Sequence, residues 1–282
     1  MRHLFIFGLG YSGQAIARLA LAHGFTVSGT SRDPQKRAAL KAEGINAVDF
    51  PLADPTALKD ATHVIAAAAP GEQGDPVLNL HQADIPANAW IGYLSTTGVY
   101  GNWNGEWVDE TSALRATADR SLKRIAAEQA WANAFPQTEI FRLAGIYGLG
   151  RSVFDKLRAG KAQRIIKPGH KFGRIHVDDI ARTVLAAMAA PAPGAIYNVV
   201  DDEPAEPSEV MEEAAELMDI DPPQARSFLG GANLSPMAHS FWADNRKVRN
   251  DKVKALLGAP LIYPTYREGL RAIFKEQFGR AP

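Results

Sequence analysis

The fold is decided by the stretch His3-Leu4-Phe5-Ile6-Phe7-Gly8-Leu9-Gly10-Tyr11-Ser12-Gly13. Its apolar first half is too short for a signal peptide or a membrane span, and it predicts a buried parallel strand over His3–Phe7. The residues Ser12–His23 place Ile16, Leu19 and Ala20 at helical spacing, which predicts a helix. A strand therefore leads through a glycine-rich turn directly into an amphipathic helix.

The glycines of this turn follow the pattern G-x-G-x-x-G. Gly8 allows a tight turn, Gly10 lets a pyrophosphate approach the backbone, and Gly13 lets the helix pack closely on the strand. Free N–H groups and the dipole at the start of a helix favour an anion. Because the motif lies between a strand and a helix, it predicts a dinucleotide-binding loop rather than three ordinary turn glycines. The residues that we expect to contact the cofactor here are Gly8, Leu9, Gly10, Tyr11, Ser12 and Gly13.

The same alternation of strands and helices continues along the chain and predicts an α/β fold, a Rossmann-type doubly wound parallel sheet. A helix is expected to begin at Pro34 with Asp33 as its N-cap. Further strands are predicted at Phe25–Gly29, Ala47–Phe50, Thr62–Ala68, Trp90–Ser95 and Thr138–Leu143, and a further helix at Arg120–Phe135. We expect residues 1–150 to form this domain and residues 175–200 to rejoin it.

The remaining residues, 151–174 and 201–282, predict a smaller, partly interleaved C-terminal lobe. Its helices are expected near Ser208–Met218, Lys247–Leu257 and Tyr266–Phe278, and another helix is expected over Asp178–Ala190 with Asp178 as its cap. The sequence contains no internal repeat and no low-complexity tract. We therefore expect the lobe to be a folded part of the molecule that contributes a substrate-binding surface.

The composition narrows the classes of function. The formal net charge is zero, which offers no electrostatic argument for nucleic acid or a membrane surface as a partner. The chain has no cysteine, which excludes disulfides, thiolate catalysis and cysteine-ligated metals. Its histidines do not show metal-ligand spacing beside an acid, so no metal is expected. Together these features predict a cytoplasmic protein that binds small molecules.

The residues after the second strand bear on the choice of cofactor. NAD-binding proteins usually carry an acid there for the ribose 2′-hydroxyl, whereas this chain has Thr30, Ser31 and Arg32. Hydroxyl groups and an arginine suit a 2′-phosphate, which an acid would repel. NADP(H) is therefore predicted, and NAD(H) is the alternative if Asp33 serves as the ribose acid instead of capping a helix. Arg32 could also be a solvated surface residue.

Four longer stretches carry a resemblance to a known family: Val64-Ile-Ala-Ala-Ala-Ala69, Leu94-Ser-Thr-Thr-Gly-Val-Tyr-Gly101, Arg142-Leu-Ala-Gly-Ile-Tyr-Gly148 and Arg174-Ile-His-Val-Asp-Asp-Ile-Ala181. They make nearly the whole chain similar to the extended short-chain dehydrogenase/reductases, the NAD(P)-dependent epimerase/dehydratase group. That group more often spaces its glycines G-x-x-G-x-x-G. The resemblance implies that Ala67, Ala68, Leu143 and Gly145 line the cofactor.

The chain departs from this group at the residues that carry its chemistry. The group uses a Ser/Thr followed by Tyr-x-x-x-Lys, and the resemblance places Thr96 on the Ser/Thr, Arg120 on the tyrosine and Arg124 on the lysine. An arginine neither accepts nor releases a proton at physiological pH. The two arginines lie one helical turn apart and predict either an anion-binding pair or two solvated side chains, with Glu128 neutralising Arg124.

Two functions from different classes follow. The chain is either an enzyme that uses another acid or base, or a non-catalytic NADP(H) sensor that has lost turnover. Tyr100 and Tyr147 are candidate acids, although packing is the expected role of both, and His176 is expected to be structural. The partner is expected to be a small, anionic substrate or ligand, and Phe172 replaces the arginine with which related enzymes hold a nucleotide sugar. The short segment 71–89 leaves room for a homodimer.

Overall fold

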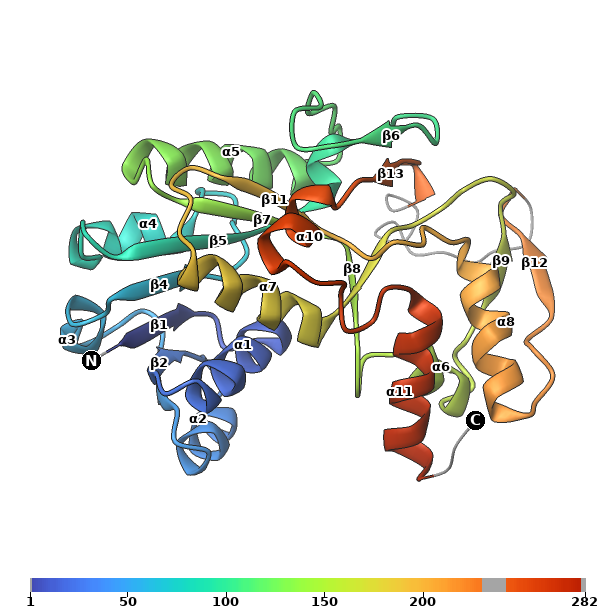
Figure 1. Cartoon of the computed structure of the whole chain (residues 1–282), viewed down its shortest axis with the longest axis horizontal. Coiled ribbons are helices and arrows are strands. Elements are labelled where there is room, and N and C mark those ends of the chain that lie inside the picture. Colours follow the sequence, from blue (N-terminus) through green and yellow to red (C-terminus); the bar gives the residue numbers. More distant parts are fainter. Residues whose placement is uncertain (1, 230–241, 280–282) are drawn as a thin grey trace. The chain divides into compact units, whose positions relative to one another are not determined.

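The computed structural model describes residues 2–229 and 242–279, which form two compact units (Figure 1). Unit 1 comprises residues 1–99, 119–143 and 180–197. Unit 2 comprises residues 100–118, 144–179 and 198–282. Every helix among the described residues falls short of the length and apolarity that crossing a membrane requires.

Unit 1 is built on a seven-stranded sheet with the order β11-β7-β5-β4-β1-β2-β3. The pairs from β7 to β3 are parallel, which confirms the predicted doubly wound α/β fold. Its strands are β1 (His3–Phe7), β2 (Thr26–Thr30), β3 (Asn46–Val48), β4 (His63–Ala66), β5 (Trp90–Thr96), β7 (Glu139–Leu143) and β11 (Ile196–Val199, whose last two residues belong to unit 2). The chain enters the sheet at an inner strand, β1, which lies between β4 and β2. The strand order reverses beside β1, where such sheets bind their ligands.

Helices cover both faces of this sheet. Side chains of a strand alternate between its faces, so Phe5 and Phe7 share one core with Val77 and Trp131 from the helices after β4 and β5. On the opposite face, Ile6 lies against the first helix at Gly13. The helices of unit 1 are α1 (Tyr11–Ala22), α2 (Pro34–Ala42), α3 (Thr56–Lys59), α4 (Pro76–His81), η1 (Gln82–Asp84), η2 (Thr97–Tyr100, whose last residue belongs to unit 2), α5 (Asp119–Ala134) and most of α7 (Val177–Ala189).

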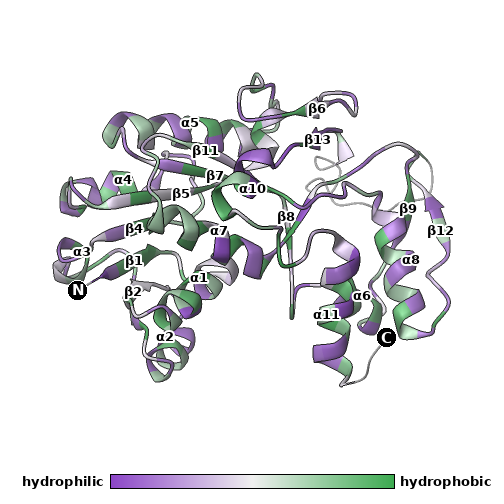
Figure 2. Cartoon of the chain, viewed as in Figure 1, coloured by the Kyte–Doolittle hydropathy of each residue, from purple (hydrophilic) through white to green (hydrophobic). Residues whose placement is uncertain are grey.

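In the described part of unit 2, three short parallel strand pairs combine with four helices. The pairs are β6 (Trp107–Val108) with β13 (Lys247–Val248), β8 (Gly145–Tyr147) with β10 (Arg174–His176), and β9 (Arg164–Ile166) with β12 (Ala225–Ser227). The helices are α6 (Val153–Arg158), α8 (Pro207–Met218), α10 (Asp251–Leu257) and α11 (Tyr266–Phe278). In Figure 2, hydrophilic and hydrophobic residues alternate along α8 and α11, as expected of helices with one buried face.

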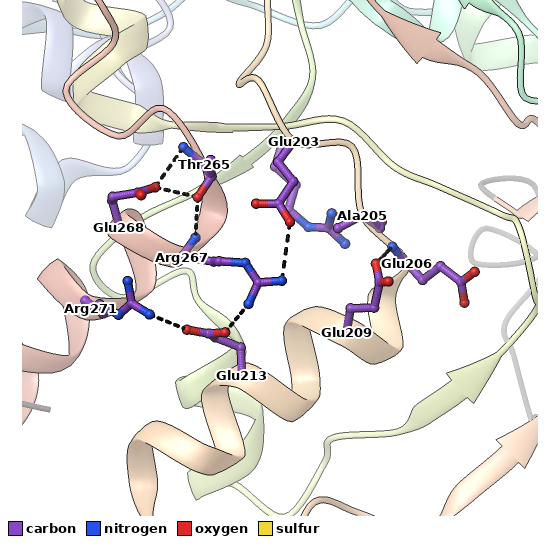
Figure 3. Close-up of polar contacts among 10 residues, drawn as sticks. Glu203, Ala205, Glu206, Glu209, Glu213, Thr265, Arg267, Glu268 and Arg271 are labelled. Carbon is purple, nitrogen blue, oxygen red and sulfur yellow. Dashed lines mark hydrogen bonds and ion pairs between the residues drawn. The ribbon is translucent and has the colours of Figure 1, made fainter.

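Polar contacts tie α8 to α11 in unit 2 (Figure 3). Arg267 and Arg271 of α11 both pair with the Glu213 carboxylate of α8. Each helix also begins with a capping box, Glu206 with Glu209 in α8 and Thr265 with Glu268 in α11. Side chains therefore satisfy backbone groups at the start of both helices.

Two local expectations for this unit are wrong. A single helix over Lys247–Leu257 is replaced by strand β13 followed by α10, because Lys247 and Val248 pair with Trp107 and Val108 of β6. Asp178 is not a cap either, since α7 begins one residue earlier and the Asp178 N–H donates to Nδ1 of His176 at 3.3 Å.

Candidate functional site

The glycine loop of unit 1 has the geometry that its motif predicts. Gly8 has φ of +97°, and a Cβ there would lie 3.2 Å from the Ala68 nitrogen. A Cβ on Gly13 would lie 2.3 Å from the Gly8 carbonyl oxygen, so only glycine lets α1 approach this turn. The Gly8 N–H donates to Oγ1 of Thr30 at 2.9 Å, and the Leu9 N–H donates to the Thr30 carbonyl at 2.8 Å. Thr30 thus holds the glycine loop in place through two hydrogen bonds.

The start of α1 is open to an anion. Gly10 is the N-cap, its extended backbone carries no capping side chain, and a Cβ placed on it would meet no atom within 4 Å. The first N–H groups of a helix have no partner within the helix, and the dipole adds positive potential there. A pyrophosphate fits this arrangement because it can approach the backbone at Gly10 without a steric obstacle.

After β2, the two candidate contacts to the ribose, Arg32 and Asp33, differ in their hydrogen bonding. Oδ1 of Asp33 accepts from the N–H groups of Gln35 at 2.9 Å and Lys36 at 3.1 Å, so it caps α2. Arg32 is exposed, and its guanidinium has no hydrogen bond or ion pair with the residues that the structure describes. Arg37 donates to the Ser31 carbonyl at 2.7 Å, which holds the backbone beside Arg32.

The end of β4 lies beside the glycine loop. The Ala67 N–H donates to the Phe7 carbonyl at 2.8 Å, and the backbone at Ala67 and Ala68 forms the surface that Gly8 approaches. The structure thus brings these two alanines together with the loop. Leu143 ends β7 in unit 1, whereas Gly145 begins β8 in unit 2.

Arg124, for which the lysine position was an expectation from the resemblance, reaches the same edge of the sheet from α5. Its Nη1 donates to the Leu94 carbonyl at 2.9 Å, the Tyr93 hydroxyl at 2.9 Å and the Ala68 carbonyl at 3.4 Å. The guanidinium therefore links the ends of β4 and β5. Arg120 lies in the first turn of α5, is partly exposed and makes contacts of its own.

Thr96 ends β5 close to α5. Its Oγ1 accepts from the Gly98 N–H at 3.1 Å. A Cβ on Gly98 would lie 3.3 Å from this Oγ1 and 3.0 Å from Oγ of Ser121, so glycine lets the turn after β5 fit against α5. Thr96 thus already uses one lone pair within the chain, while its hydroxyl proton is available.

Glu128 does not neutralise Arg124, which corrects one of the two interpretations of the arginine pair. Glu128 instead pairs with Arg142 of β7, with Nη2 to Oε2 at 2.7 Å and Nε to Oε1 at 3.1 Å. Ser95 donates to Oε1 of the same carboxylate at 2.5 Å. Both charged side chains are about 95% buried. A buried, hydrogen-bonded ion pair therefore joins α5 to β5 and β7.

Tyr93, which belongs to no motif of the sequence, is the phenol beside Arg124. Its side chain is fully buried, and burial raises its pKa to about 12 although the nearby Arg124 lowers it. It therefore stays protonated at physiological pH and is not a general base. A tyrosine in an apolar strand carries no signal in the sequence that distinguishes this position from ordinary packing.

The candidate acids in unit 2 are packed. The Tyr100 hydroxyl donates to Oδ1 of Asn198 at 2.8 Å. Burial raises the pKa of Tyr147 above that of a free phenol, with Asp201 and Asp179 adding to the effect. Burial also lowers the pKa of His176, whose ring centroid lies 4.1 Å from that of Tyr263. Within the described part of the chain, no group of acids and histidines could hold a metal ion.

Comparisons with known proteins agree with this architecture. The family model described as NADP oxidoreductase, coenzyme F420-dependent, matches residues 3–85. Protein YeeZ of Escherichia coli (strain K12) is 27% identical over 252 residues, which cover 81% of this chain and 88% of YeeZ. A functionally unknown conserved protein from Silicibacter pomeroyi DSS is 44% identical, with a TM-score of 0.90, and the match covers 99% of this chain and 100% of that chain.

More distant structures share the fold. The dTDP-glucose 4,6-dehydratase of Bacillus anthracis str. Ames, solved in complex with NAD, has a TM-score of 0.78 at 14% identity, over 99% of this chain and 97% of that chain. The UDP-glucuronic acid 4-epimerase of Bacillus cereus, also with NAD, has a TM-score of 0.75 at 15% identity, over 98% of both chains. The chain therefore belongs to one family with the Silicibacter pomeroyi protein, and its fold is that of the NAD-dependent epimerases and dehydratases, which are extended short-chain dehydrogenase/reductases.

Proposed function

We propose that unit 1 binds NADP(H) and does not use the proton relay of a tyrosine and a lysine. The observation that carries the proposal is the glycine cradle, in which Gly8 and Gly13 hold the backbone in place and the open N-terminus of α1 lies at Gly10. The pyrophosphate would lie at this N-terminus, beside the backbone of Ala67 and Ala68. When bound, the nicotinamide supplies hydride transfer.

The preference for NADP(H) over NAD(H) rests on the end of β2. Arg32 is exposed and has no partner among the described residues, while Asp33 is engaged as the cap of α2. A guanidinium suits a phosphate in charge and in geometry, and Ser31 adds a hydroxyl. A 2′-phosphate is therefore the group that this end of the strand accommodates best.

Any reaction at this site takes its proton from a group other than positions 120 and 124. Arginine remains protonated at physiological pH, and the Tyr93 phenol is buried with a pKa of about 12. The second candidate function is a non-catalytic NADP(H) sensor. The observation that favours it is the hydrogen bonding of Arg124 to two backbone carbonyls, which gives the residue a role in holding strand ends.

Calorimetric titration of the full chain with NADPH and with NADH tests the proposal, using wild type, Arg32→Glu and the control Lys41→Glu. Lys41 is exposed in the last turn of α2, so its variant makes the same charge change away from the end of β2. We expect wild type and Lys41→Glu to prefer NADPH and Arg32→Glu to lose that preference. Absence of binding of either cofactor contradicts the proposal, and equal losses in both variants contradict the role of Arg32.

A further inference from the structure

We propose that Arg124 binds an oxyanion, a carboxylate or a phosphate group of a small-molecule ligand, in the site where NADP(H) binding is proposed above. The inference rests on that proposed function for its place in the molecule. It assigns Arg124 a chemical role that a lysine in the same position would not fill. The hydrogen bonds of this one guanidinium and the partners of the neighbouring acids carry it.

Only one of the three side-chain nitrogens of Arg124, Nη1, is engaged within the described part of the chain. It donates all three hydrogen bonds of the side chain, to the Leu94 and Ala68 carbonyls and the Tyr93 hydroxyl. Within residues 2–229 and 242–279, Nε and Nη2 have no acceptor, and no carboxylate lies within 4 Å of the guanidinium. The side chain is partly exposed, so a ligand can reach it.

The acids near Arg124 form no ion pair with it. Glu128, one turn along α5, pairs with Arg142. Asp75 caps α4 through its Oδ1, which accepts from the N–H of Val77 at 2.9 Å, while its buried Oδ2 has no hydrogen-bond partner among the described residues. Both carboxylates lie close enough to raise the pKa of Tyr93, but neither forms an ion pair with Arg124. The positive charge is therefore only partly balanced within the chain.

The hydrogen bonds of Nη1 orient the other two nitrogens of the guanidinium. Because the two carbonyls and the phenol fix its plane, the side chain loses little conformational freedom when a ligand binds. Nε–H and the adjacent Nη2–H are parallel donors, and this edge fits two oxygens of one carboxylate or phosphate. A lysine offers a point charge without such a fork. Thr96, two residues after Leu94 on β5, adds a hydroxyl proton with no recorded acceptor among the described residues.

The test is a calorimetric titration of malonate, and separately of inorganic phosphate, into the full chain saturated with NADPH. Saturation keeps phosphate away from the glycine loop. The variants are Arg124→Gln, Arg124→Lys and the matched control Lys123→Gln, whose lysine is the next cation on α5 but is already paired with Glu72 and Asp119. We expect saturable binding of malonate or phosphate by wild type and Lys123→Gln, and at least tenfold weaker binding by Arg124→Gln. Arg124→Lys is expected to fall between them, and the stronger of the two probes identifies the class of oxyanion.

A second measurement keeps the proposal testable if Arg124→Gln folds poorly. The Nε–H signal of Arg124, assigned in ¹⁵N-labelled wild type by its absence from Arg124→Lys, is expected to shift on addition of the anion that binds. Absence of saturable binding of both probes by wild type, or unchanged binding by Arg124→Gln, overturns the proposal. The titration with NADPH comes before the titration with the anion and tests the proposed function on its own. If NADPH does not bind, the proposed function fails, and titration of the anion into the cofactor-free protein still decides the role of Arg124.

Discussion

Removing one partner of the buried ion pair in unit 1 gives the largest predicted loss of stability. In Arg142→Met, the Glu128 carboxylate keeps the hydroxyl of Ser95 but loses three hydrogen bonds and its counter-charge. Both partners are almost fully buried, so water cannot replace the guanidinium. Breaking such a pair costs about 3–5 kcal/mol, because a charge is left uncompensated in the interior.

The assay is urea unfolding of the full chain at pH 7. The control Arg18→Met removes an arginine that pairs with Glu43 on the surface, where both side chains are well exposed, and it is expected to cost less than about 1 kcal/mol. The double variant Arg142→Met with Glu128→Leu is expected to recover most of the loss, because the buried charge is then gone. A loss of less than about 1 kcal/mol at pH 7, or a double variant no more stable than the single one, would show that Arg142 does not compensate a buried charge on Glu128.

Three further predictions concern the loop, the cap and a buried acid. Gly13→Ala places a Cβ against the Gly8 carbonyl and is expected to weaken NADPH binding more than tenfold and to destabilise the chain by about 1–3 kcal/mol, whereas Gly71→Ala, which meets no atom within 4 Å, leaves NADPH titrations unchanged. Asp33→Ala is expected to cost about 1 kcal/mol in urea unfolding while the ratio of NADPH to NADH affinity stays the same, and a selective loss of NADH binding would identify Asp33 as the ribose acid. Burial raises the pKa of Asp201 well above its usual range, and neither of its carboxyl oxygens has a hydrogen-bond partner in the described part of the chain. Wild-type stability is therefore expected to fall as the pH rises from about 4 through the raised pKa, and Asp201→Asn removes this slope in urea titrations between pH 4 and pH 8; an unchanged slope would show that the acid does not titrate there.

Local patterns were sufficient for the main strands and the longer helices of unit 1, but they did not predict the short helices α3 and α4. The strand His3–Phe7 and the cap at Asp33 are confirmed because apolar runs, glycines and capping residues act over a few neighbouring positions. The helix expected over Lys247–Leu257 fails for the opposite reason. Its first residues pair with Trp107 and Val108, about 140 positions earlier, and no local signal reports such a partner.

In the candidate site, too, features set by neighbouring residues were predictable, and features set by distant residues were not. The glycine loop was predictable, because three glycines at fixed spacing between a strand and a helix have a direct steric meaning. The partner of Glu128 was not, because the spacing to Arg124 favours a pair along α5, while Arg142 from β7 offers a buried bidentate contact that only the tertiary structure brings near. The backbone acceptors of Arg124 leave no trace in the sequence at all.

The most direct test of the proposed NADP(H) preference is the ratio of dissociation constants of the wild-type chain for NADH and NADPH, measured by calorimetry at one ionic strength. NADPH is expected to bind at least tenfold more tightly, because Arg32 has no partner among the described residues and Asp33 is engaged as a helix cap. Equal affinities, or tighter binding of NADH, would contradict it.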